Sequence, residues 1–187
     1  MDIDIDSANR EEILKLISNV PAAIHRNGST VKHNTGLYVT DIPRDPVSGL
    51  CTIDYHQAED MGYIKLDLLN VSLYERIQNS AQLERLMNLE PDWDRLKDPE
   101  FVGRIIHINN HYSTLQKMPE PVNSIPRMAM FLSVMRPAKR HLIGLPWREV
   151  AKSVWHKPVD GSYFFKHAHA VSYAVLVAVN MNLETEC

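Results

Sequence analysis

The first ten residues alternate acidic and apolar side chains, reading Met-Asp-Ile-Asp-Ile-Asp-Ser-Ala-Asn-Arg. A period of two is typical of an extended strand, and it places Asp2, Asp4 and Asp6 on one face with two isoleucines on the other. Like charges side by side repel and raise one another's pKa, so a folded protein keeps such a row in water or around a cation. Mg²⁺ is a suitable cation because it binds one or two carboxylates and fills its other positions with water and phosphate oxygens. The alternative is an acidic terminus that only aids solubility.

The remaining apolar pattern predicts strands in the first part of the chain and mainly helices after it. Residues 21–35 carry basic side chains around an Asn-Gly turn signal, so we expect a loop there. The expected strands cover 36–40, 51–55 and 63–69, and the expected helices cover 9–17, 71–89, 100–115, 128–135, 147–155 and 164–183. Together these elements predict an α+β fold.

The strand expected over 63–69 carries two charged residues within an apolar run. Lys65 and Asp67 are two positions apart, so their side chains point to the same side of the strand. An ion pair of this kind on a protein surface contributes under about 1 kcal/mol to stability. An aspartate buried without a partner would be costly, which favours a ligand or catalytic role. Both interpretations stay open at this stage.

Basic residues gather at two places in the second half of the chain. Lys139, Arg140 and His141 follow the helix expected over 128–135, and Lys166, His167 and His169 lie near the start of the last expected helix. Solvated helix ends would explain both groups, and so would contact with phosphate. His107 and His111 are four apart and would share a face of one helix, as metal ligands can. No zinc-protease glutamate lies near them, so surface or core histidines are favoured.

Composition narrows the functional classes without selecting one. A net charge of −3 with 44% hydrophobic residues is typical of a globular protein, so any contact with nucleic acid must come from local basic patches. The two cysteines, Cys51 and Cys187, argue against a disulfide framework and a cysteine zinc site. No apolar run is long enough to span a membrane, and the acidic start lacks the basic region of a signal peptide. We therefore expect a cytoplasmic protein.

Five segments carry recognisable motifs in a fixed order along the chain. They are Met1-Asp-Ile-Asp-Ile-Asp6, His33-Asn-Thr-Gly-Leu-Tyr-Val39, Tyr63-Ile-Lys-Leu-Asp-Leu-Leu69 after Gly62, the segment from Ile125 to Arg136-Pro137, and Phe165-Lys-His-Ala-His-Ala-Val-Ser-Tyr173. They resemble motifs of the bacterial DNA polymerase III alpha subunit family. The counterparts there are Pro-Asp-x-Asp-x-Asp, His-Ala-Ala-Gly-Val-Val-Ile, Gly-Leu-Val-Lys-Phe-Asp-Phe-Leu, a fingers helix ending in Arg-Pro-Gly-Pro, and Phe-Asn-Lys-Ser-His-Ala-x-x-Tyr. The sequence between these motifs matches poorly.

The resemblance implies a small nucleotidyltransferase-like palm sheet over residues 1–80, followed by a helical fingers-like region over 81–187. It implies that Asp2, Asp4 and Asp67 are the catalytic residues and hold two Mg²⁺ ions, or Mn²⁺ in their place, for two-metal nucleotidyl transfer. The substrates would be primer-template DNA and deoxynucleoside triphosphates. Residues implied to bind the nucleotide or its phosphates are Lys65, Arg136, Lys139, Arg140, Lys166 and His169.

The departures from the family pattern concern parts that grip the substrates. The family's Gly-Ser element, which holds the triphosphate, lies upstream of the first aspartates and is absent here. The spacing between Asp4 and Asp67 leaves no room for most of the thumb. Lys166, His167 and an alanine replace the Asn-Lys-Ser of the last motif. A second polymerase chain would supply the Gly-Ser element if the enzyme is split, and so compact a replication protein would suit a virus or mobile element.

Three functions from different classes follow from these observations. The first is a minimal or split catalytic fragment of a replicative DNA polymerase, favoured by the retained aspartates. The second is a non-catalytic, polymerase-derived protein that binds DNA or a replication protein and regulates replication, favoured by the missing thumb and triphosphate element. The third is an unrelated α+β structural domain whose motif matches are accidental.

Overall fold

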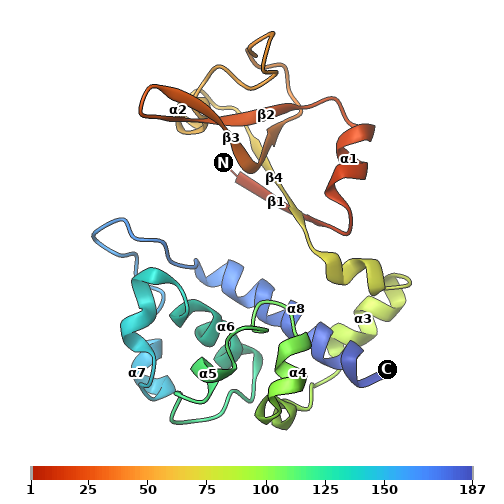
Figure 1. The fold of residues 1–187 in the computed structure, drawn as a ribbon, viewed down its shortest axis with the longest axis vertical. Coiled ribbons are helices and arrows are strands. Elements are labelled where there is room, and N and C mark those ends of the chain that lie inside the picture. The colour runs from red at the N-terminus through yellow and green to blue at the C-terminus, as the bar shows by residue number, and fades with distance from the viewer. Residues whose placement is uncertain (1, 187) are drawn as a thin grey trace. The chain divides into compact units, whose positions relative to one another are not determined.

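The computed structural model describes residues 2–186, apart from the side chain of Asp2. The chain divides into two compact units, one up to Ile77 and one from Gln78 onward. The first unit contains the sheet and the second is helical (Figure 1). The α+β class expected from the sequence is therefore confirmed. Within the described residues, no helix is both long enough and apolar enough to cross a membrane.

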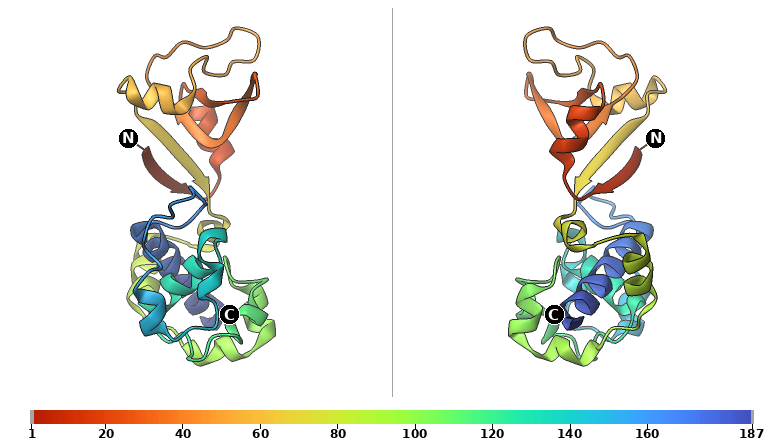
Figure 2. Two further views of the ribbon diagram at one scale, coloured as in Figure 1. Left: turned by 90° about the vertical axis from the view of Figure 1, so that its left-hand side faces the viewer. Right: turned by 90° about the vertical axis from the view of Figure 1, so that its right-hand side faces the viewer.

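The first unit is built on a mixed sheet with the strand order β1-β4-β3-β2. Strand β4 pairs in parallel with β1 and antiparallel with β3, and β3 forms an antiparallel hairpin with β2. Figure 2 shows β1 beside β4 at one edge of this sheet. The elements of the unit are β1 (Asp2–Ser7), α1 (Arg10–Leu16), β2 (Val20–Arg26), β3 (Ser29–Tyr38), α2 (Tyr55–Asp60), β4 (Lys65–Asn70) and the 3₁₀ helix η1 (Ser72–Arg76).

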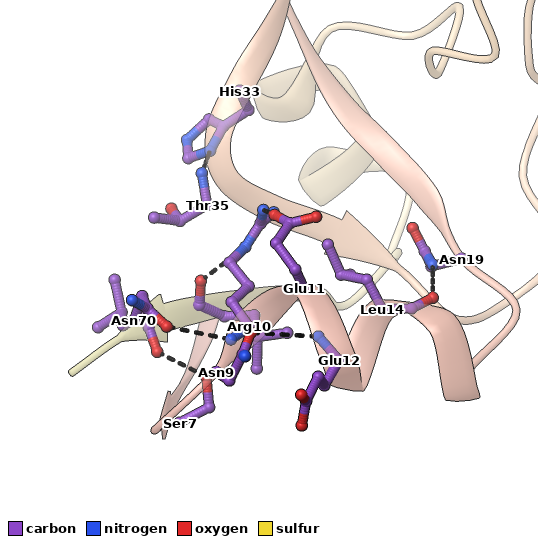
Figure 3. A network of polar contacts seen from close by, with 12 residues as sticks. Ser7, Asn9, Arg10, Glu11, Glu12, Leu14, Asn19, His33, Thr35 and Asn70 are labelled. Carbon is purple, nitrogen blue, oxygen red and sulfur yellow. Dashed lines mark hydrogen bonds and ion pairs between the residues drawn. The ribbon is translucent and has the colours of Figure 1, made fainter. Parts of the chain in front are cut away.

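Hydrogen bonds from side chains tie the ends of β1 and β4 together (Figure 3). The Ser7 hydroxyl donates to the Leu69 carbonyl at 3.0 Å. The Arg10 guanidinium donates through Nε to the Leu68 carbonyl, and its backbone N–H donates to Asn70 Oδ1, both at 3.0 Å. These bonds fix the point where the chain leaves β1 for α1. They also help to set the register of the two parallel strands, because a shift by one residue would break them all.

Two sequence expectations for the first unit are wrong. The segment 21–35 is not a loop but most of the β2–β3 hairpin. Asn27 and Gly28 form its turn with φ values of 52° and 76°, the left-handed backbone that a tight two-residue hairpin turn requires. The first half of β3 is mostly exposed, so its polar side chains hid the strand pattern. The segment 51–55 contributes only isolated bridges and the start of α2, not a strand.

The second unit is a group of helices around one apolar core. Helix α8 packs along α6 and also contacts α3. Phe101, Phe131 and Met181 are among the core side chains that are fully or almost fully buried. The elements are α3 (Ser80–Asn88), η2 (Trp93–Lys97), α4 (Pro99–Arg104), α5 (Tyr112–Leu115), α6 (Ile125–Val134), η3 (Pro137–Leu142), α7 (Trp147–Ala151) and α8 (His167–Glu186).

The helices expected over 71–89 and 100–115 are each divided in the structure. The first consists of η1 and α3, and the second consists of α4 and α5. Between α4 and α5 the chain turns at His107, which has a φ of 64°. This left-handed conformation cannot continue a right-handed helix. His107 and His111 therefore do not share a helix face, and that expectation is corrected.

Candidate metal and nucleotide site

The paired strands β1 and β4 place acidic residues from two distant parts of the chain opposite one another. In their register Asp4 is the partner of Asp67, and Asp2 is the partner of Lys65. Because directly paired residues of neighbouring strands point to the same face of a sheet, Asp4 and Asp67 lie beside each other on one face. The third expected metal ligand, the Asp2 side chain, lies outside the described residues.

Asp67 is buried, with 8% of its surface exposed, and donors of this chain contact both of its carboxylate oxygens. The Thr35 hydroxyl donates to Oδ1 at 2.7 Å. The Lys65 ammonium forms a salt bridge with Oδ2. A buried carboxylate stays charged only when such donors or cations compensate for the loss of water. The structure therefore gives Asp67 a fixed position and a charged partner.

Gly36 makes room for the Lys65 side chain. A Cβ atom at position 36 would lie 2.8 Å from Lys65 Cδ, closer than real contacts allow. Lys65 is only 3% exposed, and its ammonium lies 5.8 Å from the centre of the Tyr55 ring. The lysine stem thus lies against the sheet because its neighbour on β3 has no side chain.

His33 borders the same carboxylate but does not form a hydrogen bond with it. Its Nδ1 accepts a hydrogen bond from the Gly36 backbone N–H at 2.9 Å. Nδ1 lies 3.7 Å from Asp67 Oδ1, which is too long for a hydrogen bond. The backbone of β3 thus holds the imidazole beside Asp67.

Asp6, at the end of the acidic row, has a raised pKa. Burial, and then repulsion from Asp4, raise the pKa of Asp6. A divalent cation on this face would relieve that repulsion, and hard carboxylate oxygens are the donors that Mg²⁺ prefers. Among the side chains that the structure describes, no three of His, Cys, Asp or Glu converge tightly enough to hold a metal alone.

Two of the predicted phosphate-binding residues of the second unit, Arg136 and Lys139, are held by contacts within that unit. Arg136 stacks its guanidinium 3.8 Å from the centre of the Phe165 ring, and its Nε is buried without a hydrogen-bond partner. Lys139 is buried and donates to the carbonyls of Ser153 and His156, each at 2.7 Å. These two bonds give Lys139 a structural role. Its ammonium has a third N–H group, and phosphate binding through that group stays a prediction.

The other three predicted phosphate contacts are exposed. Arg140 donates through Nε to the Met135 carbonyl at 3.3 Å and is exposed as a residue. Lys166 and His169 lie at the start of α8. Their exposure is compatible with phosphate contact, and that role stays a prediction.

His107 gives the second unit a pH dependence that can be measured. Burial, and then the positive charge of Arg136, lower the pKa of His107 to about 4 from an ordinary value of 6.5. Between pH 6.5 and 4 the unfolded chain binds a proton that the folded chain does not, so stability falls as the pH falls through this window. We expect His107→Asn, which tolerates the positive φ, to reduce this loss by roughly 2 to 3 kcal/mol. Urea unfolding at pH 7 and pH 4.5 measures the change.

The exposed His141 supplies the matched control for that experiment. His141→Asn is expected to leave the difference between the two pH values as it is in the parent protein. An equal difference in the parent and in His107→Asn would contradict the assignment of the buried neutral histidine.

Sequence reasoning missed Thr35, Gly36 and Tyr55 as neighbours of the site. Gly36 and Thr35 lie in a recognised motif, but they contact Asp67 and Lys65 only because β3 pairs with β4 at that point. Where the polymerase III alpha motif has alanine, this chain has Thr35. Threonine adds a hydroxyl that alanine lacks, but the sequence alone does not indicate that this hydroxyl contacts Asp67.

Comparison of the chain with family models, with curated proteins and with solved structures finds no match.

Proposed function

We propose that the first unit carries a polymerase III alpha-like site for nucleotidyl transfer in DNA replication, as a minimal or split catalytic fragment. The observation that carries the proposal is the register that places Asp4 opposite Asp67. Two aspartates from segments about sixty positions apart, one exposed and one held in place, form an arrangement suited to a metal shared with substrate phosphates. Asp2 would complete the set.

In the proposed site, bound ions would supply the catalytic charge, and side chains of the protein would bind the ions and the phosphates. Mg²⁺, when bound, would supply the charge that activates a primer 3′-hydroxyl and stabilises the triphosphate in an in-line displacement. Asp4 and Asp67 would bind the ions, and Thr35 would keep the Asp67 carboxylate oriented through its 2.7 Å hydrogen bond. Lys65 would bind phosphate from the same face of the sheet. Arg136, Arg140, Lys166 and His169 would supply further charge for the nucleotide or the DNA backbone.

The partners proposed are primer-template DNA and deoxynucleoside triphosphates. A second polymerase chain that carries the Gly-Ser element would complete the grip on the triphosphate. In the first unit this partner would act beside the acidic face of β1 and β4.

A non-catalytic, polymerase-derived regulator that binds DNA or a replication protein is the second candidate. The contact of the Lys65 ammonium with Asp67 favours it, because this carboxylate is already neutralised within the chain. In such a protein the site would be a structural remnant, and the basic residues of the second unit would bind the partner.

Primer extension distinguishes the two functions. A labelled primer-template is incubated with Mg²⁺, four deoxynucleotides and the parent chain or Asp67→Asn, and the exposed Asp41→Asn serves as the matched control. A minimal enzyme is expected to give extension by the parent and by Asp41→Asn and none by Asp67→Asn. A parent chain that extends no primer, yet binds the DNA as tightly as Asp67→Asn does, would contradict a minimal enzyme and leave the split enzyme and the regulator, which differ in whether a second polymerase chain restores extension.

A further inference from the structure

We propose that the Lys65 ammonium acts as a built-in cation that closes the metal position on Asp67 until a phosphate-bearing ligand draws it away. This inference rests on the proposed function, because it concerns the order in which that site is filled. It assigns Lys65 a part in controlling metal access in addition to phosphate binding.

The contact itself is the first argument. Lys65 and Asp67 lie two positions apart on β4 and on the same face, and the ammonium contacts Asp67 Oδ2. Thr35 already donates to the other oxygen, Oδ1. A divalent cation approaching this carboxylate would therefore meet a positive charge at one oxygen and a bound hydroxyl at the other. A divalent cation bound at the same carboxylate as the Lys65 ammonium would be repelled strongly by it, because water is largely excluded from this site.

The burial of the pair is the second argument. Lys65 is 3% exposed and Asp67 is 8% exposed, so neither charge can be left without compensation. Thus Lys65 can leave Asp67 only if another cation neutralises the carboxylate and an anion accepts the ammonium. A metal ion would meet the first condition and a phosphate group the second, so the two together meet both. The expected order is therefore joint entry of the metal and the triphosphate.

The path of the lysine stem is the third argument. The absence of a Cβ at Gly36 lets Lys65 Cδ lie close to the neighbouring strand. The electron-rich face of Tyr55 lies 5.8 Å from the ammonium. The resting position of Lys65 is thus shaped by residues of β3 and α2 as well as by Asp67.

Binding of Mn²⁺ alone tests the inference without requiring activity. The free ion gives a sharp electron paramagnetic resonance signal that is lost on binding, so titration gives a dissociation constant. Lys65→Met is expected to bind Mn²⁺ at least about tenfold more tightly than the parent, and Lys65→Arg is expected to bind as weakly as the parent. Lys32→Met, which removes an exposed lysine from β3, is the matched control and should change nothing. Adding Asp4→Asn to Lys65→Met should remove the gain.

If Lys65→Met does not fold, Gly36→Ala tests the same inference. Gly36→Ala keeps every charge but places a methyl group against the Lys65 stem, and also close to His33 and Ala22. It is expected to displace Lys65 and to tighten Mn²⁺ binding as well, so unchanged binding by a folded Gly36→Ala would overturn the inference. Circular dichroism establishes folding in each case.

The outcomes separate this inference from the proposed function. Equal Mn²⁺ affinity in the parent and Lys65→Met, with loss of binding in Asp4→Asn, would overturn the role of Lys65 and leave the metal site intact. Absence of Mn²⁺ binding in every variant would overturn both.

Discussion

Asp4→Asn is expected to reduce nucleotidyl transfer by about a thousandfold or more, the effect of losing about 4 kcal/mol of transition-state stabilisation. An amide keeps the shape of the side chain but removes the negative charge that would balance a divalent cation. Asp4 is exposed, so the change should not weaken the fold. It should slightly relieve the repulsion that contributes to the raised pKa of Asp6.

This separation of activity from stability makes Asp4 a sharper test than Asp67. Asp67→Asn would also leave the buried Lys65 ammonium without its carboxylate, which destabilises a protein. The measurement compares primer extension rates with urea unfolding midpoints for the parent, Asp4→Asn and the exposed control Asp41→Asn. A fully active Asp4→Asn with an unchanged midpoint would contradict the role given to the acidic strand.

Phe131→Ala is expected to lower the stability of the second unit by about 3 to 5 kcal/mol. Phe131 lies on α6, is fully buried, and belongs to the core that α8 also enters. Removing the ring loses its transfer free energy and leaves a cavity that close-packed neighbours fill only in part. A loss of this size is a large fraction of the stability of a typical domain.

Tryptophan fluorescence reports this loss selectively, because Trp93, Trp147 and Trp155 all lie in the second unit. Urea unfolding followed by fluorescence should show a much lower midpoint for Phe131→Ala. Val159→Ala changes a fully exposed side chain and should behave like the parent. Midpoints that coincide for all three proteins would show that α6 does not support the core as described.

The sequence predicted the strands that carry the candidate site but not their pairing. Alternation in the first residues and the apolar run around Asp67 are local signals, and both segments are strands. That Asp4 is the partner of Asp67 depends on a parallel register set by contacts such as that of Ser7 with Leu69. A register of this kind is a tertiary property. The contact of Thr35 with Asp67 was unpredictable for the same reason.

The errors in the second unit have a similar origin. The only local signals of a helix break near His107 are Gly103 and the pair Asn109 and Asn110, since no glycine or proline occupies the turn itself. Ile105 and Ile108, on either side of His107, are both fully buried. Packing of these two side chains in the core therefore favours the turn over a continuous helix. Lys139 looked like a surface cation because its charge, and not its burial, is visible in the sequence.

The number of Mn²⁺ ions bound by the chain tests the central claim most directly. The titration is made with primer-template DNA and an unreactive triphosphate analogue, and mixtures without protein correct for the ions that these ligands hold alone. Two additional ions for the parent, and a clear loss in Asp4→Asn, are the predicted result. An identical count for the parent and Asp4→Asn, or no ions beyond those held by the ligands, would contradict a two-metal site on β1 and β4.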